Sequence, residues 1–307
     1  MDTNTIETDK ASGIYDSIRI NKSSSCTRPP EEMDFELVAT GNAKLQKRGS
    51  MNRSTGIVYA ATGKAYLAEA LTSAKTVRRL MPRFPITLFT DHKIGTGELF
   101  DEVIQITNPQ HSFTDKIESL MRSPYEQTLF LDTDTYLVCN CEEIFLPLEK
   151  YDIAVALETY RDEYKCENLP ACCPALNTGV IAFRQNAQVE RFLGIWKEKH
   201  DGVFCKYTRS DQPAFREALY QSDLTMFILP PEYNFRTHYP NVIGGFAKVR
   251  IIHDHNPYLE QLAALLGKKT SRPTVFGPIS PKHIVLWYYF KTRKWAHRRV
   301  RAAFNHR

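Results

Sequence analysis

Two aspartates, Asp132 and Asp134, directly follow the apolar run Leu129-Phe130-Leu131 and precede the apolar run Tyr136-Leu137-Val138. A continuous apolar run bounded by polar residues is typical of a strand that is buried on both faces of a parallel sheet. Open α/β sheets bind ligands at the carboxyl ends of such strands. In an extended backbone, residues two apart point the same way, so both carboxylates can converge on one cation or one phosphate-bearing ligand. The spacing therefore predicts a metal and nucleotide site.

Other chemistries use the same short string. An apolar strand followed by D-x-D-x-T also fits the haloacid-dehalogenase phosphatases, with Asp132 as nucleophile and Asp134 as acid/base. That scheme needs a later acidic pair at a strand end, and no D-D or G-D-x-x-x-D follows Asp134. An EF-hand loop is excluded because Tyr136 and Leu137 stand where an oxygen ligand and a glycine are needed. Acids that only cap a turn remain the structural alternative.

Alternating strands and helices surround the two aspartates and have to position them. Short apolar runs predict strands, and apolar residues at helical spacing predict a helix between Gly63 and Pro82, another over 115–122, and a third over 189–199. We also expect a helix that begins at Asp211 and ends near Tyr220, with Ser210 as its N-cap. The predicted strands are 56–61, 86–91, 102–107, 129–131, 152–157, 175–183, 225–229 and 248–252. This order favours βαβ units, and hence an α/β fold with a mostly parallel sheet.

The two ends of the chain differ in composition from its middle. Residues 1–54 are rich in polar residues and have little periodicity, which predicts a flexible segment before a domain over 55–280. Residues 281–307 predict a basic helix or tail with aromatic residues. Lys291 to Arg307 carries seven Lys/Arg and no Asp/Glu, so the rest of the chain has a formal charge near −2 although the total is +5. We therefore expect no nucleic-acid partner. The tail can lie peripherally on an anionic membrane, or its apolar part can pack on the domain.

Cysteine content and the chain's start bear on the compartment. The seven cysteines contain no C-x-x-C pair, and their odd number cannot all pair within the chain. Cys166, Cys172 and Cys173 fit no common zinc spacing, so we interpret them as loop and core thiols. The first residues are acidic where a signal peptide needs basic ones, and no stretch of about 18 apolar residues occurs. These features predict a cytoplasmic protein. The polar insertion 159–174 predicts a substrate loop or lid.

Several short motifs, in this order, resemble the GT-A nucleotide-sugar glycosyltransferases, most closely the family 8 branch that includes glycogenin and bacterial galactosyltransferases. The resemblance covers residues 56 to 260 and lies in the following segments: Ile57-Val-Tyr-Ala-Ala-Thr-Gly63 with Tyr66, Leu88-Phe-Thr-Asp91, Lys116 before Ser123-Pro-Tyr125, Leu129 to Asp134, Leu176-Asn-Thr-Gly-Val180, Ser210-Asp-Gln-Pro213 and Ile251-Ile-His253. It implies a GT-A fold, a Rossmann-like mixed and mostly parallel sheet flanked by helices. It also implies the transfer of a hexose from a nucleotide-diphosphate sugar, with a UDP-sugar favoured, to an unknown glycan, lipid or protein acceptor.

The resemblance assigns a divalent cation to the two aspartates. Asp134 is implied as a direct ligand, Asp132 as a partner of the ribose or of a metal-bound water in the same metal site, and His253 as the third protein ligand. An imidazole suits Mn²⁺ better than Mg²⁺, so Mn²⁺ is the first choice and Mg²⁺ the second. His255 is a rival for His253. Either histidine can instead be a hydrogen-bonded residue at a strand end.

The resemblance also assigns the donor and the reaction. The donor-binding residues that it implies are Ala60, Thr62, Tyr66, Lys116, Asp132, Asn177 and Gly179. Among them, Tyr66 can stack on the base and Asn177 can pair with sugar hydroxyls. Asp211 and Gln212 resemble the pair near the reacting carbon. The alternative for Asp211 is helix capping, and the alternative for Lys116 is a solvated helix lysine.

One departure from family 8 concerns the segment after His253. The family usually has a Lys-Pro-Trp there, whereas Asn256-Pro257 and a helix follow here, so the phosphate-binding lysine is missing or displaced to Lys268 or Lys269. Retention of anomeric configuration is favoured by the resemblance, while inversion needs a carboxylate base such as Asp211 or Glu158. Two other classes stay open: a nucleotide-sugar pyrophosphorylase or other nucleotidyltransferase, and a non-catalytic nucleotide-sugar binding module.

Overall fold

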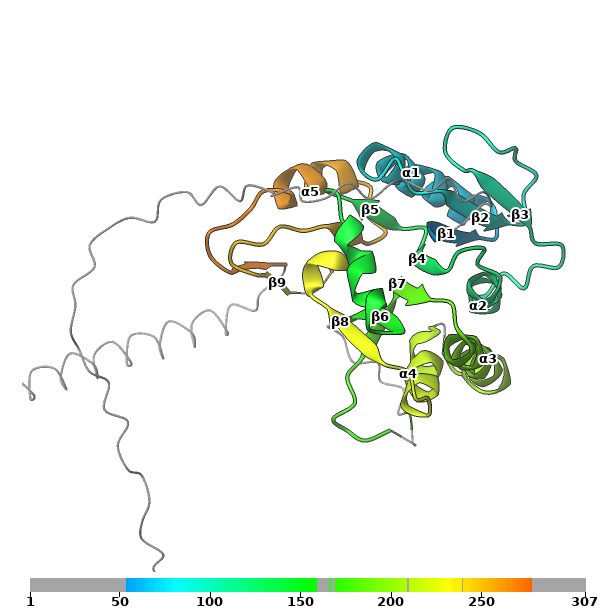
Figure 1. The fold of residues 1–307 in the computed structure, drawn as a ribbon. Helices are drawn as coiled ribbons and strands as arrows, with labels where there is room; N and C mark the ends of the chain where they lie inside the picture. The colour runs from blue at the N-terminus through cyan, green and yellow to red at the C-terminus, as the bar shows by residue number, and fades with distance from the viewer. Residues whose placement is uncertain (1–53, 159–165, 167–168, 209, 239, 278–307) are drawn as a thin grey trace, which may run out of the picture. The chain divides into compact units, whose positions relative to one another are not determined.

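The computed structural model describes residues 54–158, 166, 169–208, 210–238 and 240–277 (Figure 1). The predicted flexible segment, apart from its last residue, and the predicted basic tail lie outside the described residues. So does most of the predicted insertion 159–174. Among the helices that are described, none has the length and apolar character needed to cross a lipid bilayer.

The first half of the described chain follows the predicted alternation of strand and helix. Gly63 separates the first strand from the first helix, and Pro82 follows the end of that helix. The elements are β1 (Thr55–Ala61), α1 (Lys64–Leu80), β2 (Ile86–Thr90), β3 (Glu102–Gln105), α2 (Phe113–Met121) and β4 (Gln127–Leu131). All four strands run parallel, with β1 between β2 and β4. The carboxyl ends of these strands therefore share one edge of the sheet, and β4 ends there one residue before Asp132.

The second half completes the main sheet and reverses one strand. Its elements are β5 (Thr135–Leu137), the 3₁₀ helix η1 (Glu142–Glu149), β6 (Ile153–Leu157), β7 (Leu176–Arg184), α3 (Ala187–Gly202), η2 (Phe204–Lys206), α4 (Gln212–Tyr220) and β8 (Met226–Leu229). The seven-stranded order is β3-β2-β1-β4-β7-β6-β8. β7 runs antiparallel to β4 and β6, whereas β6 and β8 are parallel. The predicted α/β fold with a mixed, mostly parallel sheet flanked by helices is confirmed.

A small second sheet lies beside the end of β4. The remaining elements are η3 (Pro231–Tyr233), β9 (Asn241–Ile243), β10 (Ile251–His253), α5 (Leu259–Leu266) and β11 (Thr274–Phe276). β10 pairs antiparallel with β5, and this register places His253 opposite Thr135. The prediction of a strand over 248–252 was wrong at its start. β10 begins at Ile251: the O of Arg250 accepts from the N–H of Val138 at 2.8 Å, but its N–H donates to Glu232 O at 2.7 Å and not to β5.

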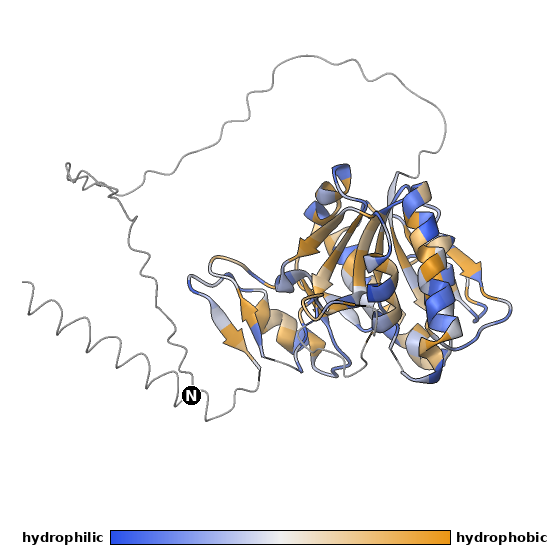
Figure 2. Cartoon of the chain, turned by 90° about the horizontal axis from the view of Figure 1, so that it is seen from below, coloured by the Kyte–Doolittle hydropathy of each residue, from blue (hydrophilic) through white to orange (hydrophobic). Residues whose placement is uncertain are grey.

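Two apolar clusters cover the two faces of the main sheet. Ile57 and Tyr59 of β1 pack with α1 and η1 in one cluster, while Val58 packs with α2, α3 and α4 in the other. This division follows from the two-residue period of side chains along a strand. Figure 2 shows the strands as mostly hydrophobic and the helices as mixed. Trp196 of α3 is fully buried in the second cluster, so α3 and α4 are fixed firmly against the sheet.

Candidate metal and nucleotide-sugar site

The two aspartates lie in a tight turn between β4 and β5 and not, as predicted, in extended backbone. The carbonyl of Asp132 accepts hydrogen bonds from the backbone N–H of Thr135 at 3.1 Å and from its hydroxyl at 2.7 Å. The N–H of Asp132 donates to Gly179 O at 2.8 Å, which ties the turn to β7. The two carboxylates therefore meet at the carboxyl edge of the sheet because the chain turns there, and not because alternate residues of a strand point the same way.

His253 joins the two aspartates in a group that can hold a metal ion. One ligand atom from each of Asp132, Asp134 and His253 lies within 4.8 Å of the others. His253 Nε2 is 3.2 Å from Asp134 Oδ1 and 3.7 Å from Asp132 Oδ2. The pairing of β10 with β5 delivers the histidine, and the N–H of Asp254 donates to Asp134 O at 3.0 Å. Two carboxylates and one imidazole are donors that fit Mn²⁺.

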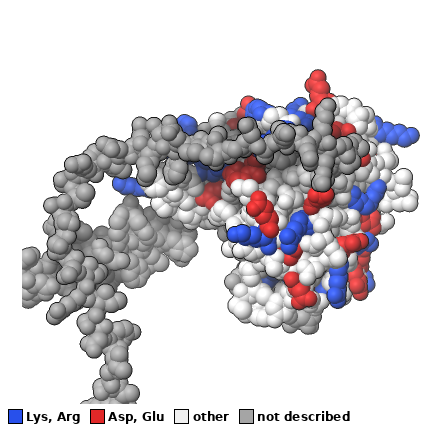
Figure 3. Space-filling view, viewed as in Figure 1, with Lys and Arg blue, Asp and Glu red and all other residues white. Residues whose placement is uncertain are grey.

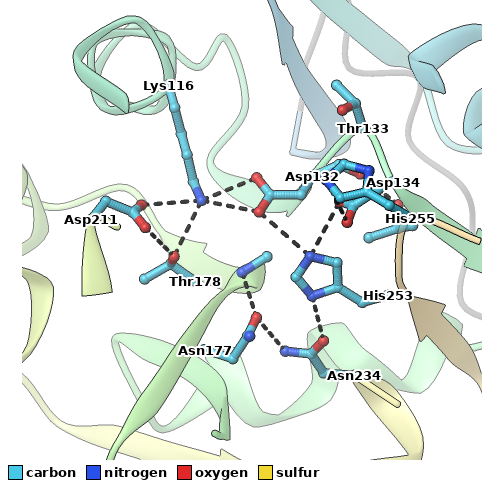
Figure 4. A network of polar contacts seen from close by, with 12 residues as sticks. Lys116, Asp132, Thr133, Asp134, Asn177, Thr178, Asp211, Asn234, His253 and His255 are labelled. Carbon is cyan, nitrogen blue, oxygen red and sulfur yellow. Dashed lines mark hydrogen bonds and ion pairs between the residues drawn. The ribbon is translucent and has the colours of Figure 1, made fainter. Parts of the chain in front are cut away.

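Lys116 connects this group to Asp211 (Figure 4). Its Nζ lies 3.0 Å from Asp132 Oδ1, 3.1 Å from Asp211 Oδ2 and 3.2 Å from the hydroxyl of Thr178. The lysine side chain is only 7% exposed, which excludes the alternative of a solvated helix lysine. Burial alone would lower the pKa of Lys116, but the two aspartates raise it above its ordinary value. The ammonium is therefore a fixed positive charge inside the site.

Asp211 faces Lys116 and does not cap the helix that follows it. It occupies the N-cap position of α4, yet its side chain makes no capping hydrogen bond. The Thr178 hydroxyl donates to Asp211 Oδ1 at 2.8 Å, and Ser210 Oγ accepts from the N–H of Gln212 at 3.3 Å. The capping alternative for Asp211 is thus excluded. Gln212, the other predicted catalytic residue, is the first residue of α4 and lies beside Asp211 in the chain.

Their surroundings shift the pKa values of the two metal-group aspartates in opposite directions. Burial raises the pKa of Asp132, and the nearby Asp134 and Asp211 raise it too, against the lowering effect of Lys116 and His253. Burial also acts to raise the pKa of Asp134, but His253, with His255 and Arg236, holds it well below its ordinary value. A bound cation would favour the ionised form of both carboxylates, so the acidic cluster is suited to a positive ligand.

His255 lies on the solvent side of the same turn. Its side chain is 62% exposed, compared with 6% for His253. Its Nδ1 is 2.9 Å from Glu69 Oε1, and its Nε2 is 3.6 Å from Asp134 Oδ2. The Thr133 hydroxyl donates to Glu69 Oε2 at 2.8 Å. His253 lies within 4 Å of both aspartates, whereas the ion pairs of His255 are with Asp134 and Glu69.

A cavity of about 700 Å³ opens beside Asp134. Its walls come from α1, from the turn between β4 and β5, and from the loop after β10, and they include Glu69, Lys75, Arg79, Thr133, Asp134, His255 and Asn256. Lysine and arginine are interspersed with acidic residues on the face of the molecule seen in Figure 3. A cavity of this size can hold a drug-sized or nucleotide-sized ligand. Asp132, Lys116 and Asp211 do not line it, so the metal group stands between this cavity and the buried lysine.

The predicted residues for the nucleoside lie apart from the polar network. Thr62 donates its hydroxyl to Asp115 Oδ2 at 2.9 Å, and the N–H of Gly63 donates to Asp91 Oδ1 at 2.9 Å. Gly63 has a φ of 97°, a backbone conformation that favours glycine. Tyr66 is 52% exposed at the start of α1, where its ring is accessible to a base. Ala60 is partly buried near the end of β1.

The structure brings seven predicted site residues together and adds others that the sequence did not indicate. The seven are Lys116, Asp132, Asp134, Asn177, Gly179, Asp211 and His253. Thr178 adds a hydroxyl between Lys116 and Asp211, and Asn234 Oδ1 accepts a hydrogen bond from His253 Nδ1 at 2.8 Å. Thr178 could have been found from its place between Asn177 and Gly179. Asn234 carries no sequence signal beyond a polar residue between two aromatic ones.

Comparisons with known proteins give structural likenesses only. No family model matches the chain, and no curated protein matches it. It is similar to a solved galactosyltransferase, LgtC, in complex with donor and acceptor sugar analogs, at 14% identity and a TM-score of 0.46 over 69% of this chain and 96% of that one. It is also similar to the glycosyltransferase GlyE of Streptococcus pneumoniae TIGR4, at 18% identity and a TM-score of 0.46, over 60% of this chain and 47% of GlyE. At such values, the function has to be argued from the residues of this chain.

Proposed function

We propose that the chain is a metal-dependent glycosyltransferase that moves a hexose from a nucleotide-diphosphate sugar, with a UDP-sugar as first candidate, to a glycan, lipid or protein acceptor. The observation that carries the proposal is the position of Asp132. It belongs to the group with Asp134 and His253, and it also contacts Lys116, which contacts Asp211. The cation site therefore lies next to a buried ammonium. Positive groups placed in this way stabilise the negative charge that develops on a departing phosphate group.

The donor set supports Mn²⁺ over Mg²⁺, because Mg²⁺ prefers oxygen ligands and His253 offers nitrogen. When bound, a divalent cation supplies charge stabilisation for the nucleoside diphosphate that leaves. The protein's own residues hold the geometry. Lys116 keeps Asp132 and Asp211 oriented toward one point, and Thr178 fixes the other oxygen of Asp211.

Retention of configuration is supported by the state of the two carboxylates that could serve as a base for inversion. Asp211 is 2% exposed and contacts Lys116 and Thr178. Glu158 accepts a hydrogen bond from Asn177 Nδ2 at 2.6 Å and lies 4.0 Å from Arg236. A base that removes a proton from an acceptor needs a free oxygen directed at it. Because both oxygens of Asp211 and the Oε2 of Glu158 already have partners within the protein, we favour a mechanism in which the leaving phosphate takes that proton.

A screen of UDP-, GDP-, CDP- and ADP-sugars, with and without Mn²⁺, tests the proposal. We expect one base class to raise the melting temperature only when Mn²⁺ is present, and the same donor to be hydrolysed slowly without an acceptor. Proton NMR of the released or transferred sugar then reports the anomer. Binding without any turnover would favour a non-catalytic module. Release of a sugar phosphate on addition of pyrophosphate would favour a pyrophosphorylase.

A further inference from the structure

The side chain of Asn177 is engaged within the protein. It is 1% exposed. Its Nδ2 donates to Glu158 Oε2 at 2.6 Å, and its Oδ1 accepts from Asn234 Nδ2 at 2.8 Å and from the N–H of Gly179 at 2.9 Å. A carbonyl oxygen has two lone pairs, and both are taken here. The oxygen of Asn177 therefore has no acceptor capacity left for a sugar hydroxyl.

The hydrogen bonds beyond Asn177 have a fixed direction. A backbone N–H can only donate, so the Asn177 atom that faces Gly179 must be the oxygen. Asn234 must then direct its NH₂ group at that oxygen and its own Oδ1 at His253. His253 Nδ1, which is 2.8 Å from this Oδ1, must carry the proton. In the neutral imidazole this leaves the lone pair on Nε2, the nitrogen that faces Asp134 and Asp132.

Gly179 supports the same ring by leaving room for it. A Cβ atom at this position would lie 1.9 Å from Cε1 of His253. No side chain fits at that distance, so any larger residue would displace the imidazole. Asn177 and Gly179 thus act on His253 from one short stretch of β7. Asn177 sets the direction of the hydrogen bonds that reach His253 through Asn234, and Gly179 leaves room for the imidazole ring.

We propose that Asn177 and Asn234 are positioning residues that hold His253 with the Nε2 lone pair directed at the metal, and that the Oδ1 of Asn177 does not accept a hydrogen bond from the donor sugar. The proposal rests on the metal site of the proposed function. Groups that hydrogen-bond the other nitrogen of a ligating histidine typically change metal affinity 10- to 100-fold when they are removed. The two asparagines are the candidates for that role toward His253.

The test compares metal and nucleotide affinities in Asn234→Ala and Asn177→Ala. Mn²⁺ affinity is measured without nucleotide from the EPR signal of the free ion, and nucleoside diphosphate and nucleotide-sugar affinities by calorimetry with saturating Mn²⁺. We expect Mn²⁺ affinity to fall about 10- to 100-fold in Asn234→Ala and several-fold or more in Asn177→Ala. We expect the preference for nucleotide sugar over nucleoside diphosphate to stay as in the wild type.

Asn186→Ala is the matched control for a purely structural asparagine. Asn186 caps α3 by accepting from the N–H of Val189 at 2.9 Å, far along the chain from the metal group. Its loss should lower the melting temperature and leave Mn²⁺ affinity unchanged. Unchanged Mn²⁺ affinity in Asn234→Ala would overturn the proposal. So would an Asn177→Ala protein that loses affinity for the nucleotide sugar alone, since that result makes Asn177 a sugar-binding residue.

A measurement on the wild type keeps the proposal testable if the variants do not fold. Long-range ¹H–¹⁵N NMR of ¹⁵N-histidine protein distinguishes the two neutral tautomers, and His253→Gln identifies the signal. We expect Nδ1 of His253 to carry a proton in the metal-free protein, and a ring with a proton on Nε2 but none on Nδ1 would contradict the proposed orientation. A wild type that binds no divalent cation would overturn the metal-dependent function itself, whereas wild-type binding that persists in both asparagine variants overturns only the role given to them.

Discussion

Asp152 and the pair Asp132 and Asp134 lie at opposite ends of the strands of the main sheet, and they differ in the groups that surround their carboxylates. Asp152 lies just before β6, and its Oδ1 accepts from Arg184 Nη2 at 2.7 Å and from Asn186 Nδ2 at 2.9 Å. Its Oδ2 accepts from the N–H and the hydroxyl of Thr225 at 2.9 and 2.7 Å. At the other end of the strands, the carboxylates of Asp132 and Asp134 face each other and an imidazole. Asp152 has hydrogen-bond donors on both oxygens, whereas Asp132 shares the one ammonium of Lys116 with Asp211.

The direction of the pKa shifts expresses the same difference. Burial acts to raise the pKa of Asp152, but its hydrogen bonds to Thr225, Arg184 and Asn186 lower it to about 2. For Asp132, burial and the neighbouring carboxylates prevail and the pKa is raised. A buried acid with a full set of donors stabilises the protein, and one whose pKa rises marks a candidate functional site. The pKa of Asp134 is lowered like that of Asp152, so the raised pKa distinguishes Asp132 alone from the structural aspartate.

The largest effect should follow from removing a carboxylate at the site. Asp134→Ala should lower Mn²⁺-dependent donor hydrolysis by about 10³-fold or more, because the direct ligand and its charge are lost. The loss is measured with the donor identified by the screen. The metal-free protein should still unfold cooperatively but at a lower melting temperature, since the contact of the ionised Asp134 with His253 is lost. Wild-type turnover in this variant would show that the aspartate pair is not the metal site.

A second comparison concerns the two histidines near Asp134. His253→Ala should weaken Mn²⁺ binding about 10- to 100-fold, because a buried ligand and its hydrogen-bonded support are removed. His255→Ala should weaken it only a few-fold, since this exposed side chain is held by Glu69 and screened by water. Calorimetric titration with Mn²⁺ measures both. The reverse order would make His255 the third ligand.

Replacing Asp152 or Asp132 by the isosteric asparagine should change the free energy of unfolding in different ways. Asp152→Asn should lower the free energy of unfolding by about 2 kcal/mol, since about two pKa units of stabilisation are lost. Asp132→Asn should leave the metal-free protein equally stable or more stable, because it removes a buried charge whose pKa is raised. Denaturant unfolding without metal measures both values. A larger loss in Asp132→Asn would mean that its contact with Lys116 stabilises the fold more than burial costs it.

The contributions of Asp152 and Asp132 to folding stability should depend on pH with opposite signs. The pKa of Asp152 is lowered on folding, so its stabilisation is present above the unfolded value of about 4 and is lost as the pH falls toward about 2. The pKa of Asp132 is raised on folding, so the folded state gains stability from this group as the pH falls through its raised value. Mn²⁺ binding should weaken over that same range, because protons compete for the ligand. Subtracting the profiles of Asp152→Asn and Asp132→Asn from the wild type isolates each contribution, and equal signs would contradict the comparison.

Local sequence patterns determined much of the fold and the main residues of the site. The apolar run before Asp132 predicted β4, and the run in Ile57 to Ala61 predicted β1, because a buried strand needs continuous apolar residues. The strand–helix alternation predicted the parallel part of the sheet. Lys116, Asp211 and His253 entered through resemblance, and the structure brings all three to the aspartates.

Only the tertiary structure decided how these residues meet. The turn after β4, and not strand alternation, directs the two carboxylates, and the pairing of β10 with β5 places His253 beside them. The role of Asn234, which follows η3, depends on which way the amide of Asn177 in β7 points, and that direction is fixed by the backbone N–H of Gly179. A sequence pattern reports neighbours along the chain and the face on which each residue lies. Register between distant strands and the direction of a buried hydrogen-bond chain arise from packing between segments, so no local pattern in the sequence contains them.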